Sequence, residues 1–106
     1  MGRELPRNDI ALLVLAVLAP LVEELVFRGL LYGWVAGRWG GLAALLVSSL
    51  AFAAAHYEPA HIVLVAPLGL WFGWLRWRTG SLLPSIVAHT INNGLAVAGA
   101  AFLGGT

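Results

Sequence analysis

Cysteine is absent from this chain of 106 residues, and charged residues make up only 10% of it. The absence of cysteine excludes disulfides and thiolate metal sites. A soluble domain typically carries about 25% charged residues, so this chain has too few to cover a water-exposed surface and is expected to lie in a lipid bilayer. The net charge is +1 and no cluster of basic residues is present, which argues against nucleic acid as a partner because phosphates need several basic groups to neutralise them.

Apolar residues dominate what is present, at 60% of the chain and a mean hydropathy of +0.88. A membrane-spanning helix needs about 20 mainly apolar residues. The segments that approach or meet this length are residues 10–35, 42–56, 61–77, and a last one from 82 or 84 to 103. Pro20 is expected to kink the first. The sequence therefore predicts an all-α, polytopic bundle of about four transmembrane helices, with one domain over residues 1–106.

Ionisable side chains interrupt the first apolar segment. Glu23 and Glu24 are adjacent, and Arg28 follows one helical turn later. A charged group at membrane depth is costly, so each one is a functional-site hypothesis. Glu24 and Arg28 share a helix face and are predicted to pair. Glu23 lies about 100° around the helix without a local partner, and such a carboxylate is suited to general acid or base chemistry.

The last apolar segment carries a polar stripe, because Ser85, His89 and Asn93 recur at every fourth residue. Residues at this spacing lie on one face of a helix. In an up-and-down arrangement, His89 comes to about the same depth as Glu23 in a hydrocarbon core about 30 Å thick. These two side chains are therefore predicted to meet.

His56 ends the second segment and lies one turn after Phe52, whose ring is expected to lean on the same helix face. The depth estimate places His56 about 10 Å nearer the N-terminal side of the membrane than Glu23, a gap that a short or tilted helix could close. Taken alone, His56 fits an interfacial histidine beside a loop. The predicted Glu24–Arg28 pair also fits a simple helix–helix clamp, so both alternatives remain open.

Three short motifs follow one another along the chain. Residues 23–28 read EELVFR, residues 52–56 read FAAAH, and residues 89–93 read HTINN. They fit the patterns EExxxR, FxxxH and HxxxN. Through them the chain, from residue 10 to about residue 103, resembles the CPBP intramembrane proteases, also called the CAAX prenyl protease 2 or Abi family. Each motif is weak by itself, but three in this order form a specific signal.

The resemblance implies an intramembrane endopeptidase of a prokaryotic cell membrane. Such an enzyme hydrolyses a peptide bond in a membrane-associated substrate, either a prenylated CAAX-type protein or a bacteriocin-like peptide. The residues that the resemblance assigns to the site are Glu23, Glu24, His56, His89 and Asn93 as catalytic residues, with Arg28 and Phe52 as structural support. Among them, Glu23 and His56 activate the attacking water, and His89 and Asn93 stabilise the resulting oxyanion.

A metal is the main mechanistic alternative. Glu23, His56 and His89 form a Glu/His/His set of the kind that binds catalytic zinc. The HExxH spacing of many zinc proteases is missing from the sequence. We therefore expect no cofactor, and the zinc site stays as the alternative.

Two functions without proteolysis also fit the polar cluster. The chain could be an inactive membrane scaffold or a peptide-binding protein, such as one that gives immunity to a bacteriocin. It could also be a small transporter subunit that relays protons through the ionisable groups. Family members usually carry further membrane spans around this core. With four spans the cavity could be open to lipid, or a second copy of the chain or a partner protein could supply the further helices.

Overall fold

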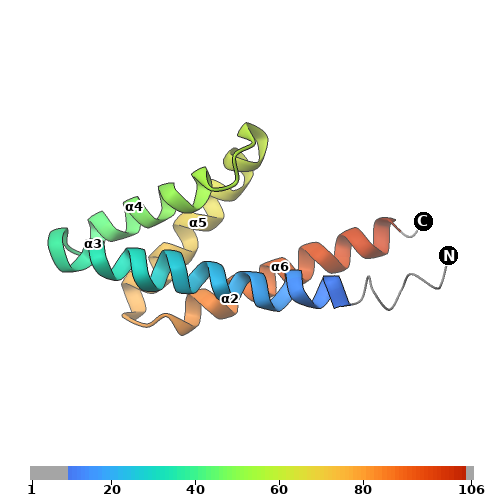
Figure 1. Ribbon diagram of the computed structural model, residues 1–106, viewed down its shortest axis with the longest axis horizontal. Helices are drawn as coiled ribbons and strands as arrows, with labels where there is room; N and C mark the ends of the chain where they lie inside the picture. Colours follow the sequence, from blue (N-terminus) through green and yellow to red (C-terminus); the bar gives the residue numbers. More distant parts are fainter. Residues whose placement is uncertain (1–9, 105–106) are drawn as a thin grey trace.

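The computed structural model describes residues 10–104 of the chain, and within that range it is helical and contains no β-strand. Four long helices follow one another: a first helix over Ile10–Trp39, α4 over Gly41–Ala54, α5 over Pro59–Thr79, and α6 over Leu83–Gly104 (Figure 1). The prediction of an all-α helix bundle is confirmed.

The helix ends differ from the predicted ones by a few residues. The first helix continues beyond its predicted end to Trp39, and Gly40 alone separates it from α4. Gly40 has a φ of 91°, which glycine adopts without steric cost. α4 ends at Ala54, so His56 lies in the following turn and not on the helix as predicted. Pro59 then begins α5, at a position where a missing amide proton is harmless.

The first helix alternates between two hydrogen-bond registers. Its π-helical segments η2 (Val14–Leu18) and η3 (Leu25–Leu31) flank the α-helical segment α2 (Ala19–Glu24), and α3 (Tyr32–Trp39) completes it. Pro20 explains η2, because its ring crowds the carbonyl four residues earlier and it has no N–H to donate. The N–H of Ala19 bonds to the carbonyl of Val14, five residues back. Pro20 is thus accommodated by local widening of the helix.

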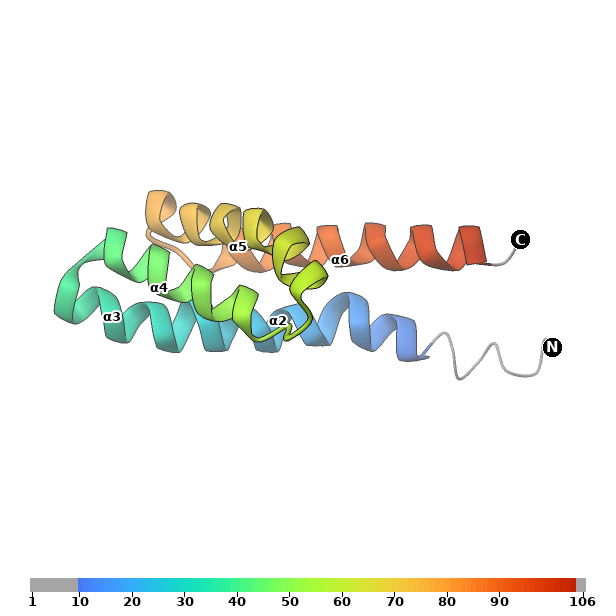
Figure 2. The same cartoon turned by 90° about the horizontal axis from the view of Figure 1, so that it is seen from above.

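The helices pack in the order of the chain, and the last one returns to the first. α4 contacts α3 and α5, while α6 contacts α5, α2 and η2. Figures 1 and 2 show α4 and α5 as a hairpin beside one half of the first helix, with α6 running along the other half. The glutamate-bearing segment α2 therefore lies where α6 meets the first helix.

The distribution of polar and apolar side chains is that of a membrane protein. The first helix and α5 meet the length and hydropathy expected of membrane spans, yet only 11% and 17% of their most apolar windows are buried. Core helices of a soluble protein would be mostly buried. α6 has 22 residues, whereas α4 has 14 and is shorter than a core about 30 Å thick requires. Polar side chains lie inside instead: Glu24, Arg28, Ser48, Ser49, Ser85 and His89 are all buried.

Two glycines let α4 and α5 approach closely. A Cβ atom built on Gly69 would lie 2.8 Å from the Phe52 ring, and one on Gly73 would lie 2.8 Å from the Ser49 hydroxyl. Both distances are too short for real carbon contacts. Since membrane helices associate through close backbone approach at small residues, these glycines set the distance between α4 and α5.

Gly69→Ala is therefore expected to destabilise the protein by about 1–3 kcal/mol, the usual cost of overpacking a filled interior. Gly33→Ala is the matched control, because a Cβ there meets nothing within 4 Å. Alanine favours a helix over glycine by up to about 1 kcal/mol, so this control should be neutral or stabilising. Unfolding of both variants in detergent micelles measures the difference. Equal stability of the two variants would show that α4 and α5 have room for an added methyl group at Gly69.

Candidate active site

A buried ion pair forms the centre of the site. Arg28 donates from Nη1 to Oε2 of Glu24 at 3.1 Å, and both side chains are 0% exposed. This confirms the pair predicted from their spacing. Nη2 of Arg28 donates to the carbonyl of Gly69, which also accepts the hydroxyl of Ser49 at 3.1 Å. The guanidinium lies over the ring of Phe52, 4.5 Å from its centroid. Arg28 thus joins the first helix to both α4 and α5.

His89 connects the two glutamates. Its Nδ1 lies 2.7 Å from Oε2 of Glu24, and its Nε2 lies 3.4 Å from Oε1 of Glu23. The prediction that Glu23 and His89 meet at one depth is confirmed by this contact. Because a carboxylate only accepts hydrogen bonds, Nδ1 carries the proton that is donated to Glu24. The tautomer of His89 is therefore set by Glu24, and Nε2 faces Glu23.

Two aromatic rings fix the plane of His89. The ring of Phe72 is stacked on it, with 4.7 Å between centroids and 21° between planes, and the ring of Phe52 meets it edge-on at 5.4 Å. Ser85, one turn before His89 on α6, donates to the carbonyl of Phe72 at 2.8 Å. Phe72 was not among the site residues predicted from the sequence. The small residues Gly69 and Gly73 on either side of it, at the spacing of close helix contacts, are the signal that could have found it.

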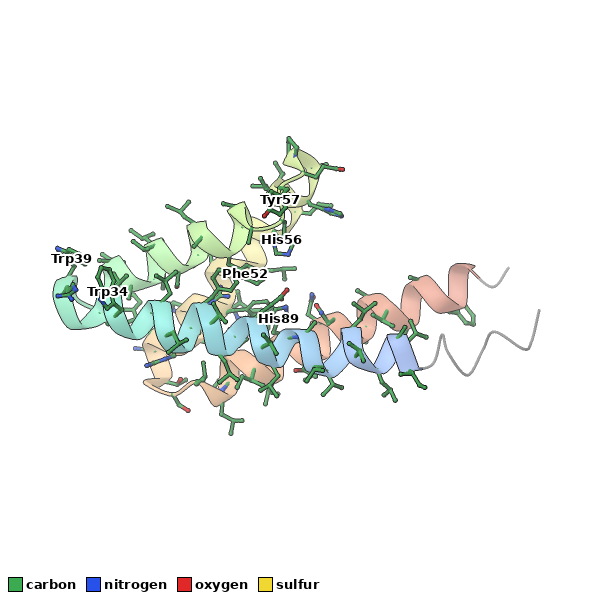
Figure 3. The ribbon with its side chains drawn as sticks, viewed as in Figure 1. Trp34, Trp39, Phe52, His56, Tyr57 and His89 are labelled. Carbon is green, nitrogen blue, oxygen red and sulfur yellow. The ribbon has the colours of Figure 1, made fainter. Side chains whose placement is uncertain are left out.

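His56 reaches the site only through Phe52. Its Nδ1 lies 2.8 Å from the carbonyl of Phe52, and the two rings are 5.1 Å apart. Figure 3 shows Phe52 between His56 and His89. Since a carbonyl only accepts, Nδ1 of His56 is the protonated nitrogen and Nε2 keeps its lone pair. His56 is thus in the tautomer that can accept a proton on Nε2.

Asn93 contacts the first helix and not the glutamates. Its Nδ2 donates to the carbonyl of Leu15 at 3.0 Å. In the π register the donor for that carbonyl would be residue 20, which is Pro20 and has no N–H. The N–H of Ala19 is already bonded to Val14. Asn93 therefore satisfies a carbonyl that Pro20 leaves without a partner, and its part in catalysis stays a prediction.

The two glutamates differ in access. The side chain of Glu23 is 39% exposed, whereas that of Glu24 is fully buried and that of His89 is 4% exposed. Glu23 is therefore the more accessible of the two carboxylates. Among the described residues, Oε1 of Glu24 and Nε of Arg28 have no hydrogen-bond partner.

The three residues of the alternative zinc set do not converge. His56 is separated from His89 by the ring of Phe52, and both nitrogens of His89 already face carboxylates. Over residues 10–104, no group of three or more His, Asp or Glu side chains is arranged to hold a metal ion. The alternative set of Glu23, His56 and His89 therefore does not fit a zinc ion in this geometry.

The chain has recognisable relatives. It matches the family model described as type II CAAX prenyl endopeptidase Rce1-like over residues 7–95. It is 29% identical over 86 residues to the protein named "Putative membrane peptidase YdiL" of Bacillus subtilis strain 168. It is 34% identical over 92 residues to an uncharacterized 24.3 kDa protein of Escherichia coli. It is 30% identical over 103 residues to the membrane-embedded CAAX protease MroQ of Staphylococcus aureus strain USA300.

These alignments cover 81%, 82% and 92% of this chain but only 35%, 42% and 40% of the three relatives. The chain thus spans about two fifths of the length of the curated relatives it matches. No solved structure shows a significant match to it.

The family match extends over most of the chain and includes all three motifs and every side chain of the site described above. Two of the relatives carry names that state a membrane peptidase or protease. The apolar helices agree with that environment. The chain therefore belongs to the Rce1-like family of type II CAAX prenyl endopeptidases and is an integral membrane protein.

Proposed function

We propose that this chain is the core of an intramembrane endopeptidase that hydrolyses a peptide bond with a water molecule activated by Glu23 and His56. The observation that carries the proposal is the difference between the two glutamates. Glu23 is open and faces His89, while Glu24 is buried and held by Arg28 and His89. One carboxylate is thus free to react, and the other holds the histidine.

In the proposed reaction, Glu23 takes a proton from the water as the water oxygen attacks the scissile carbonyl carbon. The carbonyl electron pair moves to its oxygen and forms a tetrahedral oxyanion. When the oxyanion collapses, the carbon–nitrogen bond breaks and the proton held by Glu23 passes to the leaving amine. Nε2 of His56, which keeps its lone pair, would orient the same water by accepting a hydrogen bond from its other O–H, which requires the Phe52 ring between His56 and His89 to move aside. A positioned base of this kind contributes about 10²–10⁴ to a rate.

Stabilisation of the oxyanion is assigned to His89 and Asn93. His89 donates from Nδ1 to Glu24, so a second proton on Nε2 makes that nitrogen a donor toward the reacting carbonyl. Asn93 lies one turn further along α6 and would have to exchange the Leu15 carbonyl for the oxyanion. Donors fixed in a site without bulk water are the usual means of stabilising such a charge.

An apolar hollow supports a membrane-associated substrate. It has a volume of about 570 Å³ between α5 and α6, and its lining includes Trp71, Leu75, Val87, Ile91, Asn92 and Leu95. Asn92 precedes the motif residue Asn93 on α6, while the side chains of Glu23, Glu24 and His89 do not line the hollow. We propose a substrate that is a membrane-bound peptide, either prenylated as in CAAX-type proteins or a bacteriocin-like peptide.

We also propose that further helices, from a second copy or a partner, complete the site.

An inactive scaffold or peptide-binding protein is the second candidate. It is favoured by the state of the predicted oxyanion donors, because both nitrogens of His89 face carboxylates and Nδ2 of Asn93 is bonded to Leu15. Such a protein would hold a peptide beside the same polar cluster without cutting it, as an immunity protein would hold a bacteriocin.

Cleavage of a peptide panel by the purified wild-type protein tests the proposal. The panel contains short lipidated and unlipidated peptides in proteoliposomes, with and without a chelator, and mass spectrometry detects new termini. Cleavage that the chelator leaves unchanged is the expected result. Loss of cleavage on chelation would overturn the metal-free mechanism. Peptide binding without any cleavage would favour the scaffold.

A further inference from the structure

Arg76 makes a contact that none of the three motifs explains. It lies near the end of α5, and its Nε donates at 3.2 Å to the backbone carbonyl of Arg28 in the π-helical segment η3. Its guanidinium lies over the ring of Tyr32, 4.5 Å from the centroid. Tyr32 is 4% exposed and is the first residue after η3. Arg76 thus contacts the first helix at the point where its register returns from π to α.

The π register takes the usual α-helical donor away from the Arg28 carbonyl. In an α-helix this carbonyl would accept the N–H of Tyr32, four residues later. Here that N–H bonds to the carbonyls of Phe27 and Gly29 instead. A carbonyl buried in a membrane protein without a partner is costly. The guanidinium of Arg76 therefore gives this carbonyl a donor from α5 where the Tyr32 N–H has turned to other carbonyls.

The other π-helical segment is stabilised in the same way. In η2, the carbonyl of Leu15 loses its helical donor and accepts Nδ2 of Asn93 from α6. The segment that carries the two glutamates lies between these two contacts. A change of register by one residue turns a helix face by about 100°, which would carry Glu23 and Glu24 away from His89. The two carbonyl contacts therefore bear directly on where the glutamates point.

We propose that Arg76 is a positioning residue of the site: its contacts with the Arg28 carbonyl and the Tyr32 ring hold η3 in the register that directs Glu23 and Glu24 toward His89. Arg76 itself touches no side chain of the two glutamates or His89, so it acts only through the first helix. Replacing Arg76 would therefore move the glutamates only if it changes the register of η3. Loss of the arginine charge alone would leave them in place. The functional part of this inference rests on the proposed peptidase activity.

The kinetic test compares Arg76→Gln with Arg78→Gln, since Arg78 is an exposed arginine two residues further along the same helix. Arg76→Gln is expected to lower kcat by about 10–100-fold, the range that a misplaced reacting group produces, with KM changed less than twofold. Arg76→Lys keeps a cationic donor and is expected to recover most of the activity. Arg78→Gln should match the wild type. Equal kcat values for the two glutamine variants would overturn the proposal. A loss of kcat that is fully explained by a smaller fraction of folded protein would overturn it as well.

A second readout does not depend on proteolysis. Dicyclohexylcarbodiimide modifies carboxyl groups in membranes, and mass spectrometry measures its rate of reaction with Glu23. The expected result is a change of at least about threefold in that rate in Arg76→Gln and no change in Arg78→Gln. If the wild type cleaves no peptide, the proposed function fails but this measurement still decides the role of Arg76. Equal labelling of Glu23 in the wild type and Arg76→Gln would then overturn it.

Discussion

Peptide cleavage by the Glu23→Gln variant is expected to fall about 10²–10⁴-fold below that of the wild type, the usual contribution of a general base. The glutamine amide has nearly the same size as the carboxylate but cannot accept a proton from water. Glu23 is the open glutamate of the site, with a side chain 39% exposed, so its replacement leaves the buried network of Glu24, Arg28 and His89 in place. The loss should therefore appear in kcat, with KM and folded yield close to those of the wild type.

Glu58→Gln is the matched control, because Glu58 is an exposed glutamate in the turn before α5, outside the site. Initial rates over a range of concentrations of one cleaved peptide give kcat and KM for both variants. Cleavage by Glu23→Gln at more than about a tenth of the wild-type rate would contradict the assignment of Glu23 as the base. An equal loss in the Glu58→Gln control would point to a general effect of negative charge.

Arg28→Met is expected to destabilise the protein by about 3–5 kcal/mol, the cost of removing one partner from a buried ion pair. Arg28 is fully buried, and its guanidinium is the donor that Glu24 and the Gly69 carbonyl share. Methionine fills a similar volume but leaves the Glu24 carboxylate buried with His89 as its remaining partner. The variant should give a lower yield of folded protein in detergent and unfold earlier in a denaturant titration.

Two further variants separate charge from packing. Arg38→Met makes the same substitution at an exposed arginine that lies over the ring of Trp34, and should cost less than about 1 kcal/mol. In the double variant Glu24→Gln with Arg28→Met, no unpaired charge remains, so the combined loss should be smaller than the sum of the single losses by about 0.5–3 kcal/mol. Strict additivity would mean that the pair is not coupled. A normal yield of Arg28→Met with lost cleavage would give Arg28 a direct catalytic role.

Composition and residue spacing were enough to predict the membrane bundle and the centre of the site. The shortage of charge and the lengths of the apolar runs led to an all-helical membrane protein, and the structure confirms it. The Glu24–Arg28 pair followed from spacing within one helix. The meeting of Glu23 with His89 followed from counting helical rise from opposite ends of two spans. Such contacts depend on geometry that any regular helix shares.

The lateral contacts between neighbouring helices could not be predicted from residue spacing. Nothing in the spacing of Arg28 shows that it bonds to the carbonyl of Gly69, or that Phe72 is stacked on His89. These contacts depend on how far each helix is rotated about its own axis and how closely it approaches its neighbour. At α5, the rotation of the helix and its distance from α4 are set by Gly69 and Gly73. These residues have no side chain, so Phe52 and Ser49 can lie close to the α5 backbone.

The π-helical segments explain most of the remaining differences. A sequence read at 3.6 residues per turn places Asn93 on the His89 face, but only the register around Pro20 leaves the Leu15 carbonyl for Asn93 to satisfy. The same holds for Arg76, which reads as an interfacial basic residue until the Arg28 carbonyl is seen to lack its helical donor. The sequence by itself therefore determined roughly which residues lie at which depth, because the rise per residue changes only slightly between the α and π registers. The tertiary structure alone decided which of them touch, because rotation and register depend on the helices packed beside them.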